Sequence, residues 1–218
     1  MGTRDFRTRL SKRAARARIP LSSELLDKLS AYYELLARWN KKINLTALED
    51  PDAAIDRLLL EPVAAARHLP VSAARLMDVG SGGGSPAIPL KLAANGVGLT
   101  MVEVKARKSA FLREAIRHLG LSDTTVENSR FEELLSRPEL HERFDVLTLR
   151  AVRLEPRLLN TIQAFVRPGG QILLFQGSSR AEPSEIVVPP LEWTATHTLA
   201  EPLQSRLTVL TKRNTAAR

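Results

Sequence analysis

The stretch Asp78-Val79-Gly80-Ser81-Gly82-Gly83-Gly84-Ser85-Pro86 connects a short apolar run to an amphipathic segment that begins near Ile88. The apolar run, Leu76–Val79, predicts a buried strand, and the amphipathic segment predicts a helix. Glycines between a strand and a helix let the backbone turn tightly and approach a ligand closely. The stretch therefore predicts a ligand-binding loop at the carboxyl end of a strand in an α/β fold.

Two glycine patterns compete for this loop. A dinucleotide fingerprint, G-x-G-x-x-G/A, would place Ser85 at its third position. The pattern D/E-x-G-x-G-x-G is fitted by Asp78, Gly80, Gly82 and Gly84. It resembles loops that bind S-adenosylmethionine (AdoMet), which implies that Asp78 orders the loop and nearby water, while Gly80 and Gly82 make room for the amino-acid end of the cofactor. AdoMet is the favoured ligand; a dinucleotide, or a glycine turn without a ligand, remains the alternative.

A second acidic residue follows the next predicted strand. Glu103 lies 25 residues after Asp78, where a strand-end carboxylate can accept hydrogen bonds from both ribose hydroxyls. The alternative is an ordinary ion pair with Lys105 or Arg107. Position and spacing favour the ribose site.

The rest of the chain alternates short apolar runs with longer amphipathic segments, which is typical of β–α units and a parallel sheet. We expect an α/β fold with a mostly parallel seven-stranded sheet, helices on both faces and an N-terminal helical extension; several α/β folds, the Rossmann-like fold among them, fit this order of elements. The expected strands are Leu76–Val79, Leu99–Val104, Thr125–Val126, Val146–Leu149, Gln171–Phe175, and an edge hairpin of Trp193–Leu199 and Leu207–Thr211. The first expected helix is capped by Ser22 or Ser23 and ends near Asn40. Further helices are expected at roughly 53–68, with a break near Pro62, and at 88–94, 108–119, 131–135 and 156–166. A tight turn is expected at Pro168-Gly169-Gly170.

Charge is unevenly distributed along the 218 residues, whose formal net charge is +8. Residues 1–18 carry seven Lys/Arg and one Asp, a net of +6, and the last seven residues add Lys212, Arg213 and Arg218. We expect a basic arm (1–21), a helical extension (22–70), a ligand-binding domain (71–212) and a basic tail (213–218). The arm is interpreted either as an RNA contact or as a solvated tail.

Absences narrow the chemistry. The chain has no Cys, so disulfides, thiolate metal sites and a Cys nucleophile are excluded, and its four His show no metal-ligand spacing. No apolar run approaches the length of a membrane span. After the fourth predicted strand stands Leu149-Arg150-Ala151-Val152 instead of the [DN]-P-P-[FY] of amine methyltransferases. A methyl acceptor with a free lone pair, such as guanine N7, suits this site because it needs in-line positioning and no base.

Motifs along most of the chain resemble one family, the ribosomal RNA small-subunit methyltransferase G family, also called glucose-inhibited division protein B. The resemblance covers roughly residues 22–177. It is carried by the segments 35–46 (LLARWNKKINLT), 78–82 with Ile88-Pro89-Leu90, Lys108 to Arg113, Ser129-Arg130 with Glu132-Glu133, and Phe144-Asp145 with Arg150-Ala151. Composition and the missing metal-ligand and membrane-span patterns predict a cytoplasmic protein without a metal or a membrane partner, with a monomer as the default. The resemblance implies a class I, Rossmann-like methyltransferase fold. Its implied reaction is AdoMet-dependent N7 methylation of one guanine in small-subunit ribosomal RNA, near the decoding region.

Site residues follow from the resemblance by position. Gly80 and Ser85 would line the cofactor, Glu103 would hold its ribose, and Phe131-Glu132 would lie at its adenine. Arg150 would lie beside the methionine end and the target base, and Arg130 is a further catalytic candidate. The ordinary alternatives are that Arg130 pairs with Glu133 and that Arg150 only caps its strand.

The chain departs from the family pattern at three places: Ser85 and Ala87 in the loop, Leu58 where the family has a His, and Gln176 where it has a Lys. Two rival functions stay open. One is a non-catalytic RNA-binding or ribosome-assembly factor that retains the fold, and the other is a small-molecule methyltransferase. Trp39 and the Tyr32/Tyr33 pair are expected to pack helices rather than stack on bases.

Overall fold

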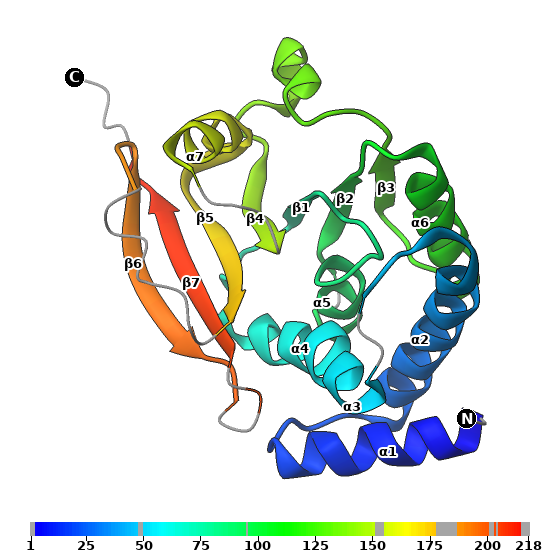
Figure 1. The fold of residues 1–218 in the computed structure, drawn as a ribbon. Helices are drawn as coiled ribbons and strands as arrows, with labels where there is room; N and C mark the ends of the chain where they lie inside the picture. The colour runs from blue at the N-terminus through cyan, green and yellow to red at the C-terminus, as the bar shows by residue number, and fades with distance from the viewer. Residues whose placement is uncertain are drawn as a thin grey trace.

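The computed structural model describes residues 3–47, 50–94, 96–150, 155–177, 187–200, 203 and 205–214. These residues form a seven-stranded sheet of order β3-β2-β1-β4-β5-β7-β6 (Figure 1). Its strands are β1 (Arg75–Val79), β2 (Gly98–Val102), β3 (Thr124–Glu127), β4 (Phe144–Arg150), β5 (Val166–Gly177), β6 (Leu191–Thr198) and β7 (Ser205–Lys212). Strands β1 to β5 pair in parallel, and β7 runs antiparallel to both β5 and β6. The predicted α/β fold and edge hairpin are confirmed.

Side chains along each strand point alternately into two apolar layers, one on each face of the sheet. In β4, Val146 belongs to the layer beneath the N-terminal helices, whereas Leu147 and Leu149 belong to the opposite layer. In β5, Leu173 and Phe175 take the first layer in the same way. Asp78 of β1 and Thr148 of β4 are paired in register and point toward the first layer by this alternation. The sheet thus brings its central polar residues to the face that the N-terminal helices cover.

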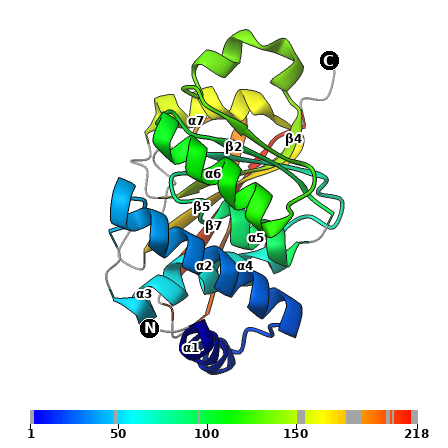
Figure 2. The ribbon, with the colours of Figure 1, turned by 90° about the vertical axis from the view of Figure 1, so that its right-hand side faces the viewer.

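Helices lie on both faces of the sheet. Figure 2 shows α2 and α6 in front of it, and α7 packs into the opposite layer. The α-helices are α1 (Thr3–Arg16), α2 (Ser23–Ile43), α3 (Pro51–Ala54), α4 (Glu61–Ala65), α5 (Ala87–Ala93), α6 (Ala106–Leu119) and α7 (Pro156–Ile162). As predicted, α2 begins at a serine cap: the Ser22 hydroxyl accepts the Leu25 N–H at 3.1 Å. It ends before Asn44, whose φ of +44° is left-handed.

The second helical segment follows a continuous path from Pro51 to His68. It joins α3 to a π-helix (Ile55–Leu60), α4 and a 3₁₀ turn (Ala66–His68). The π-helix ends at Leu60, and Pro62, near which the sequence predicts a break, lies in the first turn of α4. Because the Glu61 N–H donates to the Asp56 carbonyl, and Pro62 has no N–H, the carbonyl of Arg57 has no α- or π-type partner in the helix.

Two short elements differ from their predicted form. Residues Pro168 to Gly170 do not form a turn that precedes β5; they lie inside it as an irregularity in its pairing with β4, with Gly169 at φ +74°. The helix expected at 131–135 is a single 3₁₀ segment, Glu133–Ser136. Both differences reflect short sequences in which tertiary packing outweighs local preference.

The sequence analysis interprets the basic N-terminal segment either as an arm that contacts RNA or as a solvated tail. In the structure this segment forms helix α1, which packs against the rest of the protein. Apolar side chains on one face of this helix are buried in the core, with Phe6 at 2% and Leu10 at 0% exposure. Phe6 also stacks on Tyr33 of α2 with ring centroids 4.1 Å apart. Burial of one apolar helix face supplies enough hydrophobic free energy to order a segment that its net charge alone would leave in solvent.

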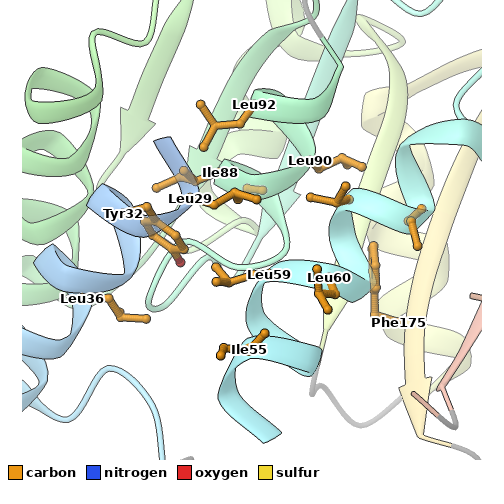
Figure 3. Close-up of a cluster of buried hydrophobic side chains, with 14 of the residues drawn as sticks. Leu29, Tyr32, Leu36, Ile55, Leu59, Leu60, Ile88, Leu90, Leu92 and Phe175 are labelled. Atoms are coloured by element: carbon orange, nitrogen blue, oxygen red, sulfur yellow. The ribbon is translucent and has the colours of Figure 1, made fainter. Parts of the chain in front are cut away.

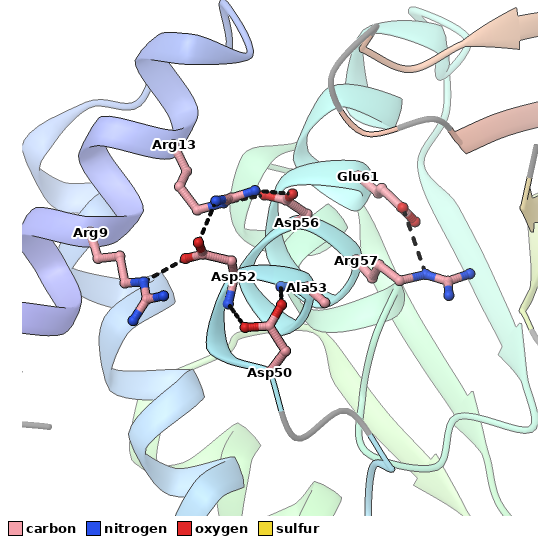
Figure 4. Close-up of polar contacts among 8 residues, drawn as sticks. All are labelled: Arg9, Arg13, Asp50, Asp52, Ala53, Asp56, Arg57 and Glu61. Atoms are coloured by element: carbon pink, nitrogen blue, oxygen red, sulfur yellow. Dashed lines mark hydrogen bonds and ion pairs between the residues drawn. The ribbon is translucent and has the colours of Figure 1, made fainter.

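Aspartates of the helical segment from Pro51 to His68 form ion pairs with arginines of α1 and so neutralise part of its charge (Figure 4). Arg9 donates to Asp52 at 2.5 Å, and Arg13 pairs with Asp52 at 2.8 Å and Asp56 at 2.5 Å. At the other end, Lys212 is buried and donates to the Glu142 carboxylate at 2.9 Å, while Arg213 pairs with Glu192. Arg218 lies outside the described residues. Much of the basic excess therefore stabilises the fold.

Leu10→Ala tests whether α1 belongs to the core. Because Leu10 is fully buried, we expect the substitution to lower the free energy of unfolding by about 2–5 kcal/mol. Chemical denaturation monitored by circular dichroism measures the change, and Ser11→Ala, on the exposed face of the same helix, is the control. A Leu10→Ala chain as stable as the parent would restore the arm interpretation.

Candidate functional site

The glycine loop follows the carboxyl end of β1, and backbone hydrogen bonds hold it to the end of β2. The N–H groups of Gly80 and Ser81 donate to the Val102 carbonyl at 2.9 and 3.0 Å. Gly80 has φ +76°, a conformation that L side chains rarely adopt, and a Cβ built there would meet no atom within 4 Å. The loop therefore exposes bare backbone beside open space, which is the geometry that close approach of a ligand requires.

Asp78 lies beneath this loop and is 1% exposed. Its Oδ1 accepts the Thr148 hydroxyl at 2.6 Å, and its buried Oδ2 has no partner among the described residues. Burial raises the pKa of Asp78, and hydrogen bonds to its carboxylate oppose the shift. A buried acceptor without a partner indicates a donor supplied from outside the chain, such as a ligand amine or a bound water.

Glu103 follows β2 and is 6% exposed. One carboxylate oxygen accepts the Gly82 N–H at 2.9 Å, and the other accepts the Lys105 backbone N–H at 2.8 Å. The expected alternative, an ion pair with the Lys105 side chain, is thus replaced by a bond to its backbone. Since each carboxylate oxygen can accept more than one bond, Glu103 can hold the loop and still receive hydroxyls.

Arg150 ends β4 with 15% of its side chain exposed. Its Nη2 donates to Glu61 Oε2 at 3.0 Å, and its Nη1 donates to the Arg57 carbonyl and, at 3.3 Å, to the Ser85 hydroxyl. The guanidinium lies 4.7 Å from the centroid of the Phe175 ring. Arg150 therefore does more than cap its strand, because it joins the glycine loop, β5 and the helical extension.

Glu61 was missed by sequence reasoning, although it lies in this cluster and is 4% exposed. Burial raises its pKa, whereas the nearby Arg150 lowers it. Pro62 carried a usable signal, since a proline inside a helical pattern frees carbonyls of the preceding turn. Accordingly, the Leu58 carbonyl accepts the Ser85 hydroxyl at 2.8 Å. The polar serine at this unusual loop position has a specific partner.

The remaining predicted site residues follow β3. Phe131 is half-buried against the apolar layer opposite the N-terminal helices, and Glu132 and Arg130 are exposed. The bond that Glu133 accepts from Arg130 comes from the backbone N–H, at 3.3 Å. Arg130 follows β3, and β3 lies three strand spacings, about 14 Å, from β4 because β2 and β1 lie between them. The structure does not bring the two arginines into one cluster.

The other singled-out side chains pack as follows. Tyr32 is fully buried and donates to the Gly83 carbonyl at 2.6 Å, and Trp39 packs edge-on against Phe111, as the packing interpretation expected (Figure 3 shows Tyr32). Gln176, which stands where the family has a Lys, is buried in the sheet and accepts the Thr208 hydroxyl at 3.1 Å. It is buried because it lies on β5, which pairs with β7 at this point.

The described residues hold no cluster of metal-ligating side chains and no helix able to cross a membrane. No group of three or more His, Cys, Asp or Glu side chains there is arranged to hold a metal ion. None of the helices in the same ranges combines the length and apolar character that crossing a membrane requires.

Comparison with solved structures shows the same fold in AdoMet-related proteins. An O-methyltransferase from Bacillus cereus, in complex with SAH, superposes with a TM-score of 0.58 at 17% identity, covering 93% of this chain and 96% of that one. A variant of MtNAS in complex with S-adenosylmethionine gives a TM-score of 0.56 at 14% identity, covering 88% and 80%. At these identities the likeness establishes the fold alone.

Sequence comparison is more specific. The family model described as rRNA small subunit methyltransferase G matches residues 25–204. Proteins named ribosomal RNA small subunit methyltransferase G are similar to this chain at 34% identity in Geobacillus kaustophilus (84% of this chain, 75% of that protein) and 37% in Stenotrophomonas maltophilia (81% and 80%). The matched range contains the glycine loop, Glu103 and the Arg150 cluster. The chain therefore belongs to the rRNA small subunit methyltransferase G family.

Proposed function

We propose that this protein is an AdoMet-dependent methyltransferase that modifies N7 of one guanine in small-subunit ribosomal RNA, acting as a monomer in the cytoplasm. The observation that carries the proposal is the family match across residues 25–204, which includes the whole glycine loop and the strand ends around it. The names of the relatives support small-subunit ribosomal RNA as the substrate class.

The residues of the loop fit AdoMet. The unpartnered Asp78 Oδ2 offers an acceptor for the methionine amino group or its water, and open space at Gly80 admits the amino-acid end. Glu103 would accept the ribose hydroxyls, Ser85 and Gly82 would line the loop, and Phe131 with Glu132 would lie at the adenine. When bound, AdoMet supplies a methyl group that its sulfonium makes electrophilic.

The protein's own contribution is positioning. Guanine N7 carries a free lone pair and no proton, so the chain needs no general base for its methylation. Arg150, at the carboxyl end of β4, would orient the cofactor's methionine end and the target base, and its positive charge would be held by Glu61 rather than by solvent. Arg130, on the far side of β1 and β2, is proposed as an RNA contact at the edge of the site.

Transfer of radiolabelled methyl from AdoMet to small subunits that lack the modification tests the proposal. We expect one methyl group per subunit, mapped by mass spectrometry to N7 of a single guanine. RNA binding without transfer would favour the non-catalytic factor. Transfer only to small molecules would favour the small-molecule enzyme.

The exposed face of α1 supplies a candidate RNA contact. Unlike Arg9 and Arg13, the side chains of Lys12, Arg16 and Arg18 are exposed on or just after this helix. A triple Gln variant at Lys12, Arg16 and Arg18 should weaken RNA binding and reduce the slope of log K against log salt by about 2, if most of these cations touch phosphates.

Fluorescence anisotropy over a salt series measures that slope. Arg13→Gln is the matched control, because it removes one positive charge that already pairs with Asp52 and Asp56. We expect this control to lower the melting temperature and to leave the salt slope unchanged. An unchanged slope in the triple variant would mean that α1 does not contact RNA.

A further inference from the structure

We propose that Glu61 is a positioning residue that fixes the orientation of the Arg150 guanidinium at the carboxyl end of β4. The proposal rests on the proposed function, in which Arg150 lies beside the reacting groups. Glu61 itself need not touch substrate or cofactor. Its side chain acts through Arg150.

The burial of both partners is the first support. Glu61 is 4% exposed, and its Oε2 accepts Arg150 Nη2 at 3.0 Å. A carboxylate so deeply buried stays charged only with a hydrogen-bonded cation beside it. Arg57 is the other cation nearby, but its Nε lies 4.0 Å from Glu61 Oε1 and its side chain is 53% exposed (Figure 4). The cation that is hydrogen-bonded to Glu61 is therefore Arg150, through Oε2, while the buried Oε1 has no hydrogen-bond partner among the described residues.

The irregular helix before Pro62 supplies the second hold. Because Glu61 donates its N–H to Asp56 and Pro62 has none to give, the Arg57 carbonyl is available to Arg150 Nη1. The same turn thus presents a carboxylate and a carbonyl to one guanidinium. Two acceptors at a fixed separation set the orientation of the planar guanidinium group, whereas a single ion pair would let the group rotate.

The sheet closes the remaining face. Phe175 is the register partner of Arg150 on β5, and the centroid of its ring lies 4.7 Å from the guanidinium carbon. Among the described residues, the contacts with Glu61, Arg57 and Ser85 engage three of the five guanidinium N–H groups. Two donors remain for a ligand, and their direction is set by the three that are engaged.

Glu61→Gln removes the charge and keeps the shape. We expect its kcat for methyl transfer to fall about 10- to 100-fold, because a shift of about 1 Å in an orienting group costs up to that much. The KM for AdoMet should change less than kcat. In the Arg150→Ala background the same substitution should cause no further loss, since no guanidinium is left to orient.

Asp145→Asn is the matched control. Asp145 is also buried, lies at the other end of β4, and pairs with Arg167 at 2.6 Å. Its loss should lower the melting temperature without changing kcat. If Glu61→Gln fails to fold, Glu61→Asp retains the charge pair but withdraws the carboxylate by one methylene, and we expect a loss in kcat of about 10-fold.

Full kcat in folded Glu61→Gln or Glu61→Asp would overturn the proposal. Equal losses from Glu61→Gln in the parent and in Arg150→Ala would also overturn it, because they would show a structural role independent of Arg150. Failure of the proposed function reads differently: the unsubstituted protein would transfer no methyl group, or Arg150→Ala would retain full activity.

Discussion

Gly80→Val is expected to abolish AdoMet binding and methyl transfer. At φ +76° a β-branched residue is strained, and its side chain would enter the open space beside the loop backbone that the cofactor's amino-acid end is proposed to use. The strain alone should lower the free energy of unfolding by about 1–2 kcal/mol. Isothermal titration with AdoMet, and methyl transfer at saturating AdoMet, measure the two losses.

Gly120→Val separates strain from site disruption. Gly120 ends α6 at φ +61°, and a Cβ there would also meet nothing within 4 Å. We expect a similar loss of stability with AdoMet affinity preserved. If Gly80→Val bound AdoMet as tightly as Gly120→Val, the loop would not be the cofactor site.

Arg150→Ala should be the most damaging substitution at the strand ends. It removes the proposed orienting group, so we expect methyl transfer to fall about 100-fold or more. It also leaves Glu61 buried without its cation, which should cost about 3–5 kcal/mol of stability. Single-turnover transfer at a temperature where the variant is folded measures the first effect, and thermal unfolding measures the second.

Arg167→Ala controls for the loss of an arginine from an ion pair in the sheet. Arg167 pairs with Asp145 at the opposite end of β4, with 38% of its side chain exposed. A modest loss of stability and unchanged transfer are expected. Arg150→Ala with parent-like transfer would contradict the role proposed for Arg150 and leave the loop assignment intact.

Stability at the cluster should depend on pH through Glu61 and Asp78. Burial raises the pKa of both carboxyl groups above their values in the unfolded chain. The folded state therefore binds these protons more tightly than the unfolded state. It loses stability as the pH rises from the carboxyl pKa of the unfolded chain to the raised pKa of the folded chain. This loss is consistent with a site that stores unpaired acceptors for a ligand, because a ligand amine or cation would stabilise the charged forms.

The local sequence pattern was sufficient to predict the strand and the helix that flank the glycine loop. Alternation of apolar runs with amphipathic segments predicts the strand and helix order, because each signal lies within a few residues. The positions of Asp78 and Glu103 at strand ends follow from the same runs. Even the serine cap of α2 is visible in the sequence, since a cap bonds to a residue three positions away.

Long-range contacts decided the rest. No residue near Arg13 in the sequence indicates that it pairs with Asp56, which lies 43 residues away. The sequence alone therefore suggests that the positive charges of α1 have no acidic partners. A usable signal was present in Phe6, Leu10 and Ala14, whose helical spacing predicts a buried face. The charge of the segment concealed it.

The sequence by itself determined the glycine loop, the two strand-end carboxylates and the succession of strands and helices along the chain, because these depend on short-range periodicity and on backbone freedom at glycine. Only the tertiary structure decided that Arg150 is clamped by Glu61, Arg57 and Phe175. Those partners come from two other elements, the helical segment before Pro62 and β5, and burial makes their pairing obligatory. A charge in water has many partners available, whereas a buried charge must bind the ones that the fold provides.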